Sequence, residues 1–331
     1  MRSSKSVLLI GGAGYIGSVL AHHLVKENYN LKVLDLLIYG KKGIEDLIPN
    51  EVELIEGDIR NEKVLDVVLK NIDCVIHLAS IVGEPLCNKI PQAAKQINQL
   101  AIPNLLKKCK RNKVERFVFA STCSNYGSAK GFVNEDSPVS GLSLYSTSKI
   151  IAEKIILESE DNSFEPCILR FATAFGISPR IRFDLLLHEF IRDAIVDKKI
   201  SVFGPDFWRP LVHVDDISNA CLLAIKKPKN LISGEIYNVG DNEQNYTKLY
   251  LAKMVMNNIP ESEIEIQTSK KDPRNYKVSF DKIKNNLRFE AKKSVEDGIK
   301  EIVTEIKKNN IDPKETEFSN MSEMTSRVKV F

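Results

Sequence analysis

A chain of 331 residues, 43% hydrophobic and 27% charged, has enough apolar material for a substantial core and suits one large domain or two fused ones. Its formal net charge of +3 is too small to indicate nucleic acid or an anionic membrane as the main partner. The apolar runs are too short for a membrane span, the N-terminal residues lack a signal-peptide pattern, and the six cysteines contain no Cys-x-x-Cys pair. These features predict a cytoplasmic globular protein with free thiols and no metal site.

The first half of the chain alternates short apolar runs with amphipathic stretches, which is the pattern of a parallel sheet with crossover helices. Continuous apolar runs predict strands buried on both faces at residues 6–10, 31–35, 52–56, 74–78, 116–120 and 167–170. Periodic stretches predict helices over residues 16–27, 62–70, 91–110 and 145–158, with Pro103 kinking or ending the third. The predicted fold class is α/β, with a doubly wound parallel sheet.

The regular alternation weakens after about residue 175. We expect a helix over 182–196, a turn at Gly204-Pro205-Asp206, a strand end and a helix over 211–224, a strand at 235–239, and helices over 247–257 and 295–307. The chain is therefore predicted to have a first domain over 1–175, a smaller region over 176–314 with segments that return to the first core, and a flexible tail over 315–331.

A glycine-rich turn follows the first predicted strand. Gly11, Gly14 and Gly17 have the spacing Gly-x-x-Gly-x-x-Gly and enclose Tyr15 and Ile16 at the start of a helix. The first glycine permits a tight turn, the second lets the backbone approach a pyrophosphate, and the third permits close packing of helix and strand. Unpaired amides at the helix N-terminus favour phosphates. The turn predicts a dinucleotide site, with a glycine-rich turn that binds no ligand as the alternative.

Carboxylates end the second and third predicted strands. Asp35 is placed to bind both adenosine ribose hydroxyls and to repel a 2′-phosphate, which favours NAD over NADP, although Lys41 and Lys42 follow it. Asp58 is predicted either to accept a hydrogen bond from the adenine amine or to cap the next helix. The other residues expected to line the cofactor groove are Ile59, Leu78, Ala79 and Ser80.

Tyr145 and Lys149 form a Tyr-x-x-x-Lys pair in the helix predicted over 145–158. Positions four residues apart share one helix face, so the phenol and the ammonium can approach the same ligand. A nearby ammonium stabilises phenolate, and we therefore expect a lowered pKa for Tyr145 and a role as a base near neutral pH. The pair alone occurs by chance on many helices. It indicates a catalytic site here because a predicted dinucleotide-binding turn precedes it in the chain.

Taken in this order, the motifs resemble the extended short-chain dehydrogenase/reductase family, specifically its nucleotide-sugar epimerase/dehydratase branch. The resemblance covers roughly residues 6–305 and implies a Rossmann fold, bound NAD, a nucleotide-diphosphate sugar as substrate, and a homodimer formed through two helices per subunit. The motifs that carry it are GGAGYIG at 11–17, Asp35, GDIR at 57–60, HLAS at 77–80, Asn98, STCSNYG at 121–127, YSTSK at 145–149, RPLVHVDD at 209–216, YNVGDN at 237–242 and DPRNYKVS at 272–279.

The resemblance also implies catalytic roles. Thr122, four positions before the tyrosine of its motif, would hydrogen-bond the sugar oxygen that Tyr145 deprotonates. Lys149 would hold the nicotinamide ribose, and Asn98 would order the lysine through a bridging water. The alternative for residues 121–124 is a strand end that happens to be rich in Ser and Thr.

Three departures from the family pattern narrow the reaction and the subgroup. Family dehydratases place Asp and Glu after the catalytic threonine, whereas this chain has Cys123 and Ser124. Dehydration and decarboxylation are therefore disfavoured, and oxidation at a sugar carbon remains. Ordinary UDP-galactose epimerases usually have Asn near Thr173, which we expect to contact the substrate. The stretches 81–87 and 175–185 are similar to a subgroup that includes GDP-heptose C4 dehydrogenases.

The region after residue 175 is predicted to hold the substrate diphosphate. Arg209 matches the family arginine that reaches the phosphates, and Arg274 is a second candidate, because a guanidinium binds phosphate oxygens bidentately. Arg180 and Arg182 are weaker candidates, with exposed arginines as the alternative, and Trp208 is placed either to stack on a base or to pack.

The sequence thus favours an NAD-dependent nucleotide-sugar epimerase acting at C4. The alternative is a 4-dehydrogenase that releases the 4-keto sugar. A non-catalytic nucleotide-binding protein on the same fold is a distant third, because both Tyr145 and Lys149 are retained. An RNA-binding relative is less favoured still. The nucleotide and the sugar stay open.

Overall fold

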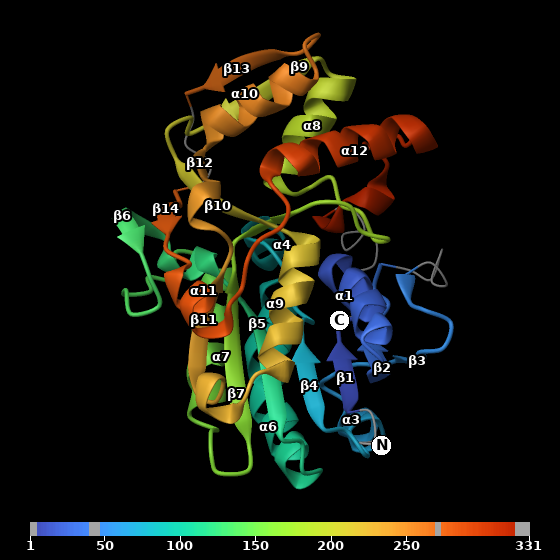
Figure 1. Ribbon diagram of the computed structural model, residues 1–331. Helices are drawn as coiled ribbons and strands as arrows, with labels where there is room; N and C mark the ends of the chain where they lie inside the picture. Colours follow the sequence, from blue (N-terminus) through green and yellow to red (C-terminus); the bar gives the residue numbers. More distant parts are fainter. Residues whose placement is uncertain (1–4, 40–46, 269–272, 322–331) are drawn as a thin grey trace.

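A seven-stranded sheet, parallel throughout, forms the centre of the molecule (Figure 1). The computed structural model describes residues 5–39, 47–268 and 273–321. The strand order is β11-β7-β5-β4-β1-β2-β3, which confirms the predicted α/β class. The strands are β1 (Ser6–Ile10), β2 (Asn30–Asp35), β3 (Glu53–Glu56), β4 (Cys74–His77), β5 (Arg116–Thr122), β7 (Glu165–Phe171) and β11 (Glu235–Val239).

The strand order reverses between β1 and β4. From β1 the chain adds β2 and β3 on one side, and it then returns to add β4, β5, β7 and β11 on the other. The loops after β1 and β4 therefore diverge, and a crevice opens outside the carboxyl ends of these two strands, where doubly wound sheets bind ligands. Val7 to Ile10 of β1 are completely buried, as expected for a strand covered on both faces.

Helices cover both faces of this sheet (Figure 1). One face packs against α1 (Tyr15–Lys26), α9 (Val214–Lys226) and α11 (Asp281–Leu287). The other packs against α3 (Glu62–Val68), α4 (Glu84–Lys89), α5 (Pro91–Lys95), α6 (Ile102–Arg111) and α7 (Leu144–Leu157). The apolar stripe of each helix is buried against the sheet, which holds the crevice between rigid walls.

The helix predicted over residues 91–110 is interrupted, as Pro103 indicated. It consists of α5, the π-helical turn η1 (Gln96–Leu100) and α6, in which Pro103 occupies the first turn. At the junction the Ala101 amide donates to the Gln96 carbonyl, five residues back, at 2.9 Å. The wider turn accommodates a proline that has no amide hydrogen for the regular helical bond.

A second hydrophobic cluster lies beyond the carboxyl edge of the sheet. It joins α8 (Leu186–Val196), α10 (Lys248–Asn258) and α12 (Val295–Asn309) to β9 (Lys199–Phe203), which pairs with β13 (Glu263–Gln267). Two small sheets connect this region to the main sheet. One contains β8 (Thr173–Phe175), β10 (Trp208–His213) and β12 (Asn245–Thr247). The other pairs β6 (Ser128–Val133) with β14 (Asn275–Val278). Short 3-10 helices are η2 (Cys123–Tyr126), η3 (Lys229–Leu231), η4 (Asn242–Gln244) and η5 (Thr316–Phe318). The domain division at residue 175 stays a prediction.

The segment after α12 differs from the flexible tail predicted to begin at residue 315. Residues 316–318 form the turn η5, and the Phe183 amide donates to the Phe318 carbonyl at 2.8 Å. The Asn320 amide donates to the Asp184 carboxylate at 2.9 Å. These contacts give residues 315–321 a defined place, and the rest of the predicted tail lies outside the described residues.

The remaining expectations concern thiols, metals and membranes. All six cysteines are free and buried, as predicted. Within residues 5–39, 47–268 and 273–321, no group of three or more His, Cys, Asp or Glu side chains is arranged to hold a metal ion. Over the same residues, no helix is long and apolar enough to cross a membrane.

Candidate active site

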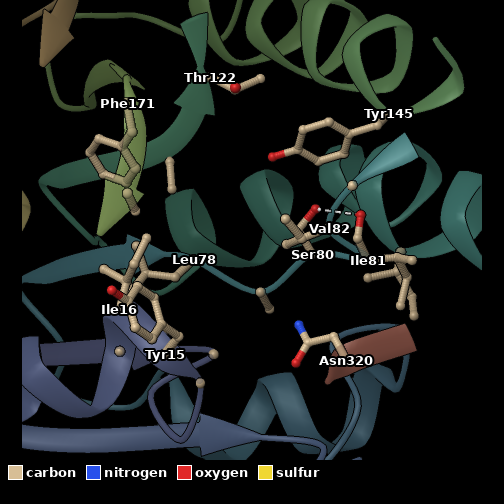
Figure 2. Close-up of a pocket in the computed structure, with 18 of the residues that line it drawn as sticks. Tyr15, Ile16, Leu78, Ser80, Ile81, Val82, Thr122, Tyr145, Phe171 and Asn320 are labelled. Atoms are coloured by element: carbon tan, nitrogen blue, oxygen red, sulfur yellow. Dashed lines mark hydrogen bonds between the residues drawn. The ribbon is translucent and has the colours of Figure 1, made fainter. Parts of the chain in front are cut away.

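One cavity at the carboxyl edge of the main sheet brings together most of the predicted site residues (Figure 2). They come from the loops after β1, β2, β3, β4, β5 and β7, from α7, and from the region after residue 175. The predicted residues that line it are Gly11, Gly14, Tyr15, Ile16, Gly17, Asp35, Asp58, Ile59, Leu78, Ala79, Ser80, Thr122, Tyr145, Lys149, Thr173, Arg182 and Arg274. Asn98 and Arg209 are not among the lining residues.

The glycine-rich turn has no room for side chains. A Cβ added at Gly17 would lie 2.2 Å from the Gly11 carbonyl oxygen, and one at Gly11, whose φ is +85°, would lie 2.6 Å from the Ala79 amide. Gly14 is the N-cap of α1 and supplies no side-chain hydrogen bond to the first turn. The first amides of α1 are thus left for a ligand, so the turn fits the pyrophosphate of a dinucleotide.

Tyr15 and the start of α1 are tied to the loop that follows β8. The Tyr15 hydroxyl donates to the Gly176 carbonyl at 2.7 Å. Ser178 donates from Oγ to the Tyr15 carbonyl at 2.7 Å, and its Oγ lies 3.0 Å from that of Ser18. These buried bonds fix the dinucleotide turn against the second region, so both regions contribute walls to one cavity.

Asp35 ends β2 at the adenosine side of the predicted dinucleotide site. Its Oδ2 accepts from the Ala13 amide at 2.9 Å and its Oδ1 from the Leu37 amide at 2.8 Å. Burial raises the pKa of Asp35, and these amide bonds oppose the rise. Two main-chain donors thus hold the carboxylate in a fixed orientation at the cavity wall. Lys41 and Lys42, the residues that left NADP open, lie outside the described residues.

Asp58 lies in the cavity wall at the end of β3 and is paired with Arg60, whose Nε donates to Oδ1 at 3.0 Å and to Oδ2 at 2.9 Å. The alternative that Asp58 caps the next helix is wrong. Asn61 is the N-cap of α3 and accepts from the Lys63 amide at 3.0 Å. The Asp58 side chain therefore has no capping role.

Lys149 occupies the catalytic end of the cavity, on α7. A capping box formed by Ser143 and Ser146 begins this helix. The Lys149 ammonium donates to the Ala120 carbonyl at 2.8 Å and lies 4.5 Å from the centre of the Phe119 ring. Burial lowers the pKa of Lys149 to about 8. The ammonium is held by β5, the strand that also ends in Thr122.

Tyr145 differs from the sequence expectation in its ionisation. Burial raises the pKa of Tyr145, and the positive charges of Arg274 and Arg182 only partly oppose this rise. The expectation that a nearby ammonium lowers the pKa is therefore corrected, because desolvation of the phenolate outweighs the charges around it. Figure 2 shows the phenol extending into the cavity from α7, with Thr122 at the end of β5 on the same side.

The two positions after Thr122 face different surroundings. Thr122 Oγ1 accepts from the Ser124 amide at 3.1 Å. The Cys123 thiol is buried and donates to the Arg170 carbonyl at 3.2 Å. Ser124 lines the cavity, and its Oγ lies 3.2 Å from Nη1 of Arg274 and 3.4 Å from the Tyr276 hydroxyl. Neither position places an acid beside Thr122.

Among the residues that the structure describes, carboxylates line the cavity only at its other end. Among the described lining residues, the acids are Asp35 and Asp58. Asp35 ends β2, and β4 and β1 separate β2 from β5. At the usual spacing of neighbouring strands, three steps amount to about 14 Å. Neither carboxylate can therefore act on a group held at Thr122.

Arg209, which is expected to reach the substrate phosphates, is not among the residues that line the cavity, and its contact with the substrate stays a prediction. It is 3% exposed, donates from Nη1 to the carbonyls of Trp208 at 2.7 Å and Arg274 at 2.6 Å, and lies over the Tyr276 ring. These contacts hold the Arg209 guanidinium beside Arg274 and Tyr276, which both line the cavity. Arg182 lines the cavity and is ion-paired with Asp184 at 2.8 Å.

Asn98 does not line the cavity but forms hydrogen bonds to residues that do. Its Oδ1 accepts from the Ile81 amide at 2.8 Å and from Ser80 Oγ at 3.0 Å, and its Nδ2 donates to the Ile81 carbonyl at 2.9 Å. Nδ2 also lies 3.5 Å from Oγ of Ser148, next to Lys149. Asn98 thus holds the loop after β4 in place, and the expected water bridge to Lys149 stays a prediction.

A buried ion pair supports the catalytic end and was missed from the sequence. Glu153 of α7 pairs with Arg170 of β7 at 2.7 Å, and both side chains are about 5% exposed or less. Asn125 donates to Glu153 at 2.9 Å, and Ser121 donates to the same oxygen. The pair joins α7, which carries Tyr145, to β7, and the Ser121 bond joins it to the end of β5 that carries Thr122. No local pattern links these side chains.

Comparisons with known proteins agree with this geometry. Residues 7–240 match the model of the NAD dependent epimerase/dehydratase family. An uncharacterized UDP-glucose epimerase of Bacillus subtilis, YtcB, is 28% identical over 88% of this chain and 95% of its own. The UDP-glucose 4-epimerase of Lactobacillus helveticus is 29% identical over 71% of this chain and 76% of its own.

Solved structures give the same result. The UDP-glucuronic acid 4-epimerase of Bacillus cereus, in complex with UDP-glucuronic acid and NAD, superposes with a TM-score of 0.83 at 27% identity, over 92% of this chain and 99% of that one. A UDP-glucose 4-epimerase from Thermotoga maritima with UDP-glucose gives a TM-score of 0.83 at 26% identity, over 92% and 100% of the two chains.

Proposed function

Because the chain belongs to the NAD dependent epimerase/dehydratase family, we propose that it is an NAD-dependent UDP-sugar 4-epimerase. The protein is a nucleotide-sugar enzyme whose cofactor is NAD. The proposal concerns the reaction and the substrate. It rests on one observation, the absence of an acid beside Thr122 among the described lining residues.

Elimination of water from a sugar needs a group that protonates the departing hydroxyl and one that removes a neighbouring proton. At the positions where dehydratases carry these acids, Cys123 is buried away from the cavity and Ser124 is a neutral hydroxyl. Asp35 and Asp58 are several strands away. The site therefore favours oxidation and reduction at one carbon over dehydration.

The residues present suit oxidation at C4. NAD, held by the Gly11–Gly17 turn and Asp35, supplies a hydride acceptor and donor when bound. Thr122 donates a hydrogen bond to the sugar oxygen at C4, and Tyr145 takes the hydroxyl proton as the C4 hydrogen leaves as hydride. Rotation of the 4-keto sugar followed by return of hydride and proton inverts C4. Lys149 provides a positive charge that favours the phenolate form of Tyr145, the form that can take the proton, against the burial that raises the pKa of Tyr145.

The relatives support a UDP-sugar as the substrate class. The proteins similar to this chain include enzymes named for UDP-glucose, and a solved relative binds UDP-glucuronic acid. Arg274 and Arg182, which both line the cavity, suit the diphosphate of such a substrate. Homodimerisation through two helices per subunit belongs to the same proposal. A 4-dehydrogenase of the GDP-heptose type is the alternative.

A substrate panel tests the reaction. The purified enzyme is incubated with UDP-, GDP-, CDP- and dTDP-sugars without added cofactor, and the products are separated by chromatography. We expect the C4 epimer of a UDP-sugar with no net NADH. Accumulation of a 4-keto sugar with stoichiometric NADH, or its dependence on an added keto acceptor, would establish a 4-dehydrogenase instead. Sedimentation equilibrium at micromolar concentration tests the dimer.

A further inference from the structure

The C-terminal strap, defined as residues 316–321, connects the two halves of the molecule. On one side, the Phe318 ring packs edge-to-face on Phe183 with centroids 5.5 Å apart, and the Phe183 amide donates to the Phe318 carbonyl at 2.8 Å. On the other side, Met321 packs against the cluster that covers the main sheet. The strap lies outside the matched family residues 7–240.

Asn320 of the strap lies in the wall of the cofactor cavity, together with the glycine-rich turn. It is 6% exposed, and its amide is anchored on Asp184 at 2.9 Å. Its Oδ1 accepts from Nη2 of Arg180 at 3.3 Å. Within the described ranges, Nδ2 has no hydrogen-bond partner. Figure 2 shows the side chain extending into the cavity opposite Ser80, Ile81 and Tyr145. Asn320 thus presents an amide donor to whatever fills the cavity.

Arg180 adds a positive charge to the same wall. Its guanidinium lies over the ring of Tyr39, 4.5 Å from the centroid, and both residues line the cavity. Its charge also opposes the rise in the pKa of Asp35 caused by burial, so it lies near the adenosine side of the predicted dinucleotide site. Amide and guanidinium donors suit phosphate and ribose oxygens.

We propose that the C-terminal strap is part of the NAD site, and that Asn320, with Arg180, binds the pyrophosphate–ribose portion of the dinucleotide and slows its release. Because Asn320 and the glycine turn line the same cavity, a dinucleotide held by the turn contacts the strap, and its release breaks that contact. This inference rests on the proposed function. A 4-epimerase must keep its cofactor bound until the hydride returns to the sugar, and the strap supplies that retention.

Cofactor release tests the strap directly. NADH bound to the enzyme is displaced by excess NAD, and the loss of NADH fluorescence gives the dissociation rate. Asn320→Ala should release NADH about 10- to 100-fold faster, which is the range for a hydrogen bond to a charged group. Asn320→Asp should be faster still, because it keeps an acceptor for Arg180 but places a negative charge against the dinucleotide. Thr316→Ala, at an exposed strap position, is the matched control.

Two outcomes would overturn the proposal. In one, Asn320→Ala releases NADH at the rate of Thr316→Ala. In the other, Asn320→Asp behaves like the unmodified enzyme, which would indicate that the side chain serves only Arg180. Circular dichroism of each variant verifies that it is folded. Because the assay needs no sugar, it separates the two proposals: a wild type that epimerises no sugar refutes the reaction alone, and unchanged NADH release refutes the strap alone.

Discussion

Replacing Lys149 with Met should make the protein more stable at neutral pH while abolishing its activity. Burial lowers the pKa of Lys149 from the ordinary 10.5 to about 8. This difference corresponds to about 3 kcal/mol of unfavourable free energy for keeping the ammonium charged in the folded protein. Met has a similar length and no charge, so the substitution removes this cost.

The lost hydrogen bond offsets part of the gain. The Lys149 ammonium donates to the Ala120 carbonyl at 2.8 Å, and leaving that carbonyl without its donor costs about 1–2 kcal/mol. Lys149→Met should therefore be more stable than the wild type by about 1–2 kcal/mol at pH 7. The stability tied to the Lys149 charge is present above the unfolded pKa of 10.5 and is lost as the pH falls to about 8. The advantage of the variant should therefore shrink above pH 8 and reverse near pH 10.

Urea unfolding of the cofactor-free protein at pH 7, 8, 9 and 10 measures this difference. Lys154→Met on the same helix is the control, because the Lys154 side chain is 77% exposed and its removal should change stability equally at every pH. A difference between wild type and Lys149→Met that does not vary with pH would refute the reasoning. It would mean that keeping the Lys149 ammonium charged in the folded protein does not raise the free energy of that state.

Four further substitutions test the site. Tyr145→Phe should retain cofactor and substrate binding while single-turnover oxidation falls roughly 10²–10⁴-fold; near-normal turnover would mean that another group is the base. Asp35→Ser should weaken NAD binding and improve NADP relative to NAD in fluorescence titrations, and equal use of both cofactors by the wild type would contradict the role of Asp35. Gly17→Ala should cost about 1–3 kcal/mol of stability, because its Cβ would lie 2.2 Å from the Gly11 carbonyl. Gly14→Ala, whose nearest contact is 3.5 Å, should lower NAD occupancy and leave the melting temperature nearly unchanged.

The main sheet was predictable because its strands are continuous apolar runs. Each of the six strands predicted in the first half of the chain lies within three residues of the observed bounds. The small strands could not be predicted, because their pairing partners are distant. β6 is mostly exposed and pairs with β14, with Ser128 opposite Asn275. The helix predicted from residue 182 begins at Leu186, because Arg182 and Asp184 are engaged in an ion pair.

The site was predictable where its residues are close in sequence, as in the Gly11–Gly17 turn and the Tyr145–Lys149 pair. Residues that act through tertiary contacts were not. Arg180 seemed at most a weak phosphate candidate, and Asn320 fell in a predicted tail, yet both line the cavity. The sign of the pKa change of Tyr145 depends on burial, which spacing along a helix does not report.

The buried cysteines provide the enzyme with native reporters of local opening. Burial raises the pKa of Cys87 to about 12, so its thiol reacts with alkylating reagents only when the surrounding structure opens. Its Sγ donates to the carbonyl of Ile81, a residue of the cavity wall, at 3.3 Å. Cys221, in contrast, lies on the buried face of α9 and is fully buried in the core. The rate of Cys87 alkylation relative to that of Cys221 therefore distinguishes local opening of the ligand cavity from unfolding of the whole protein. The comparison needs no introduced label.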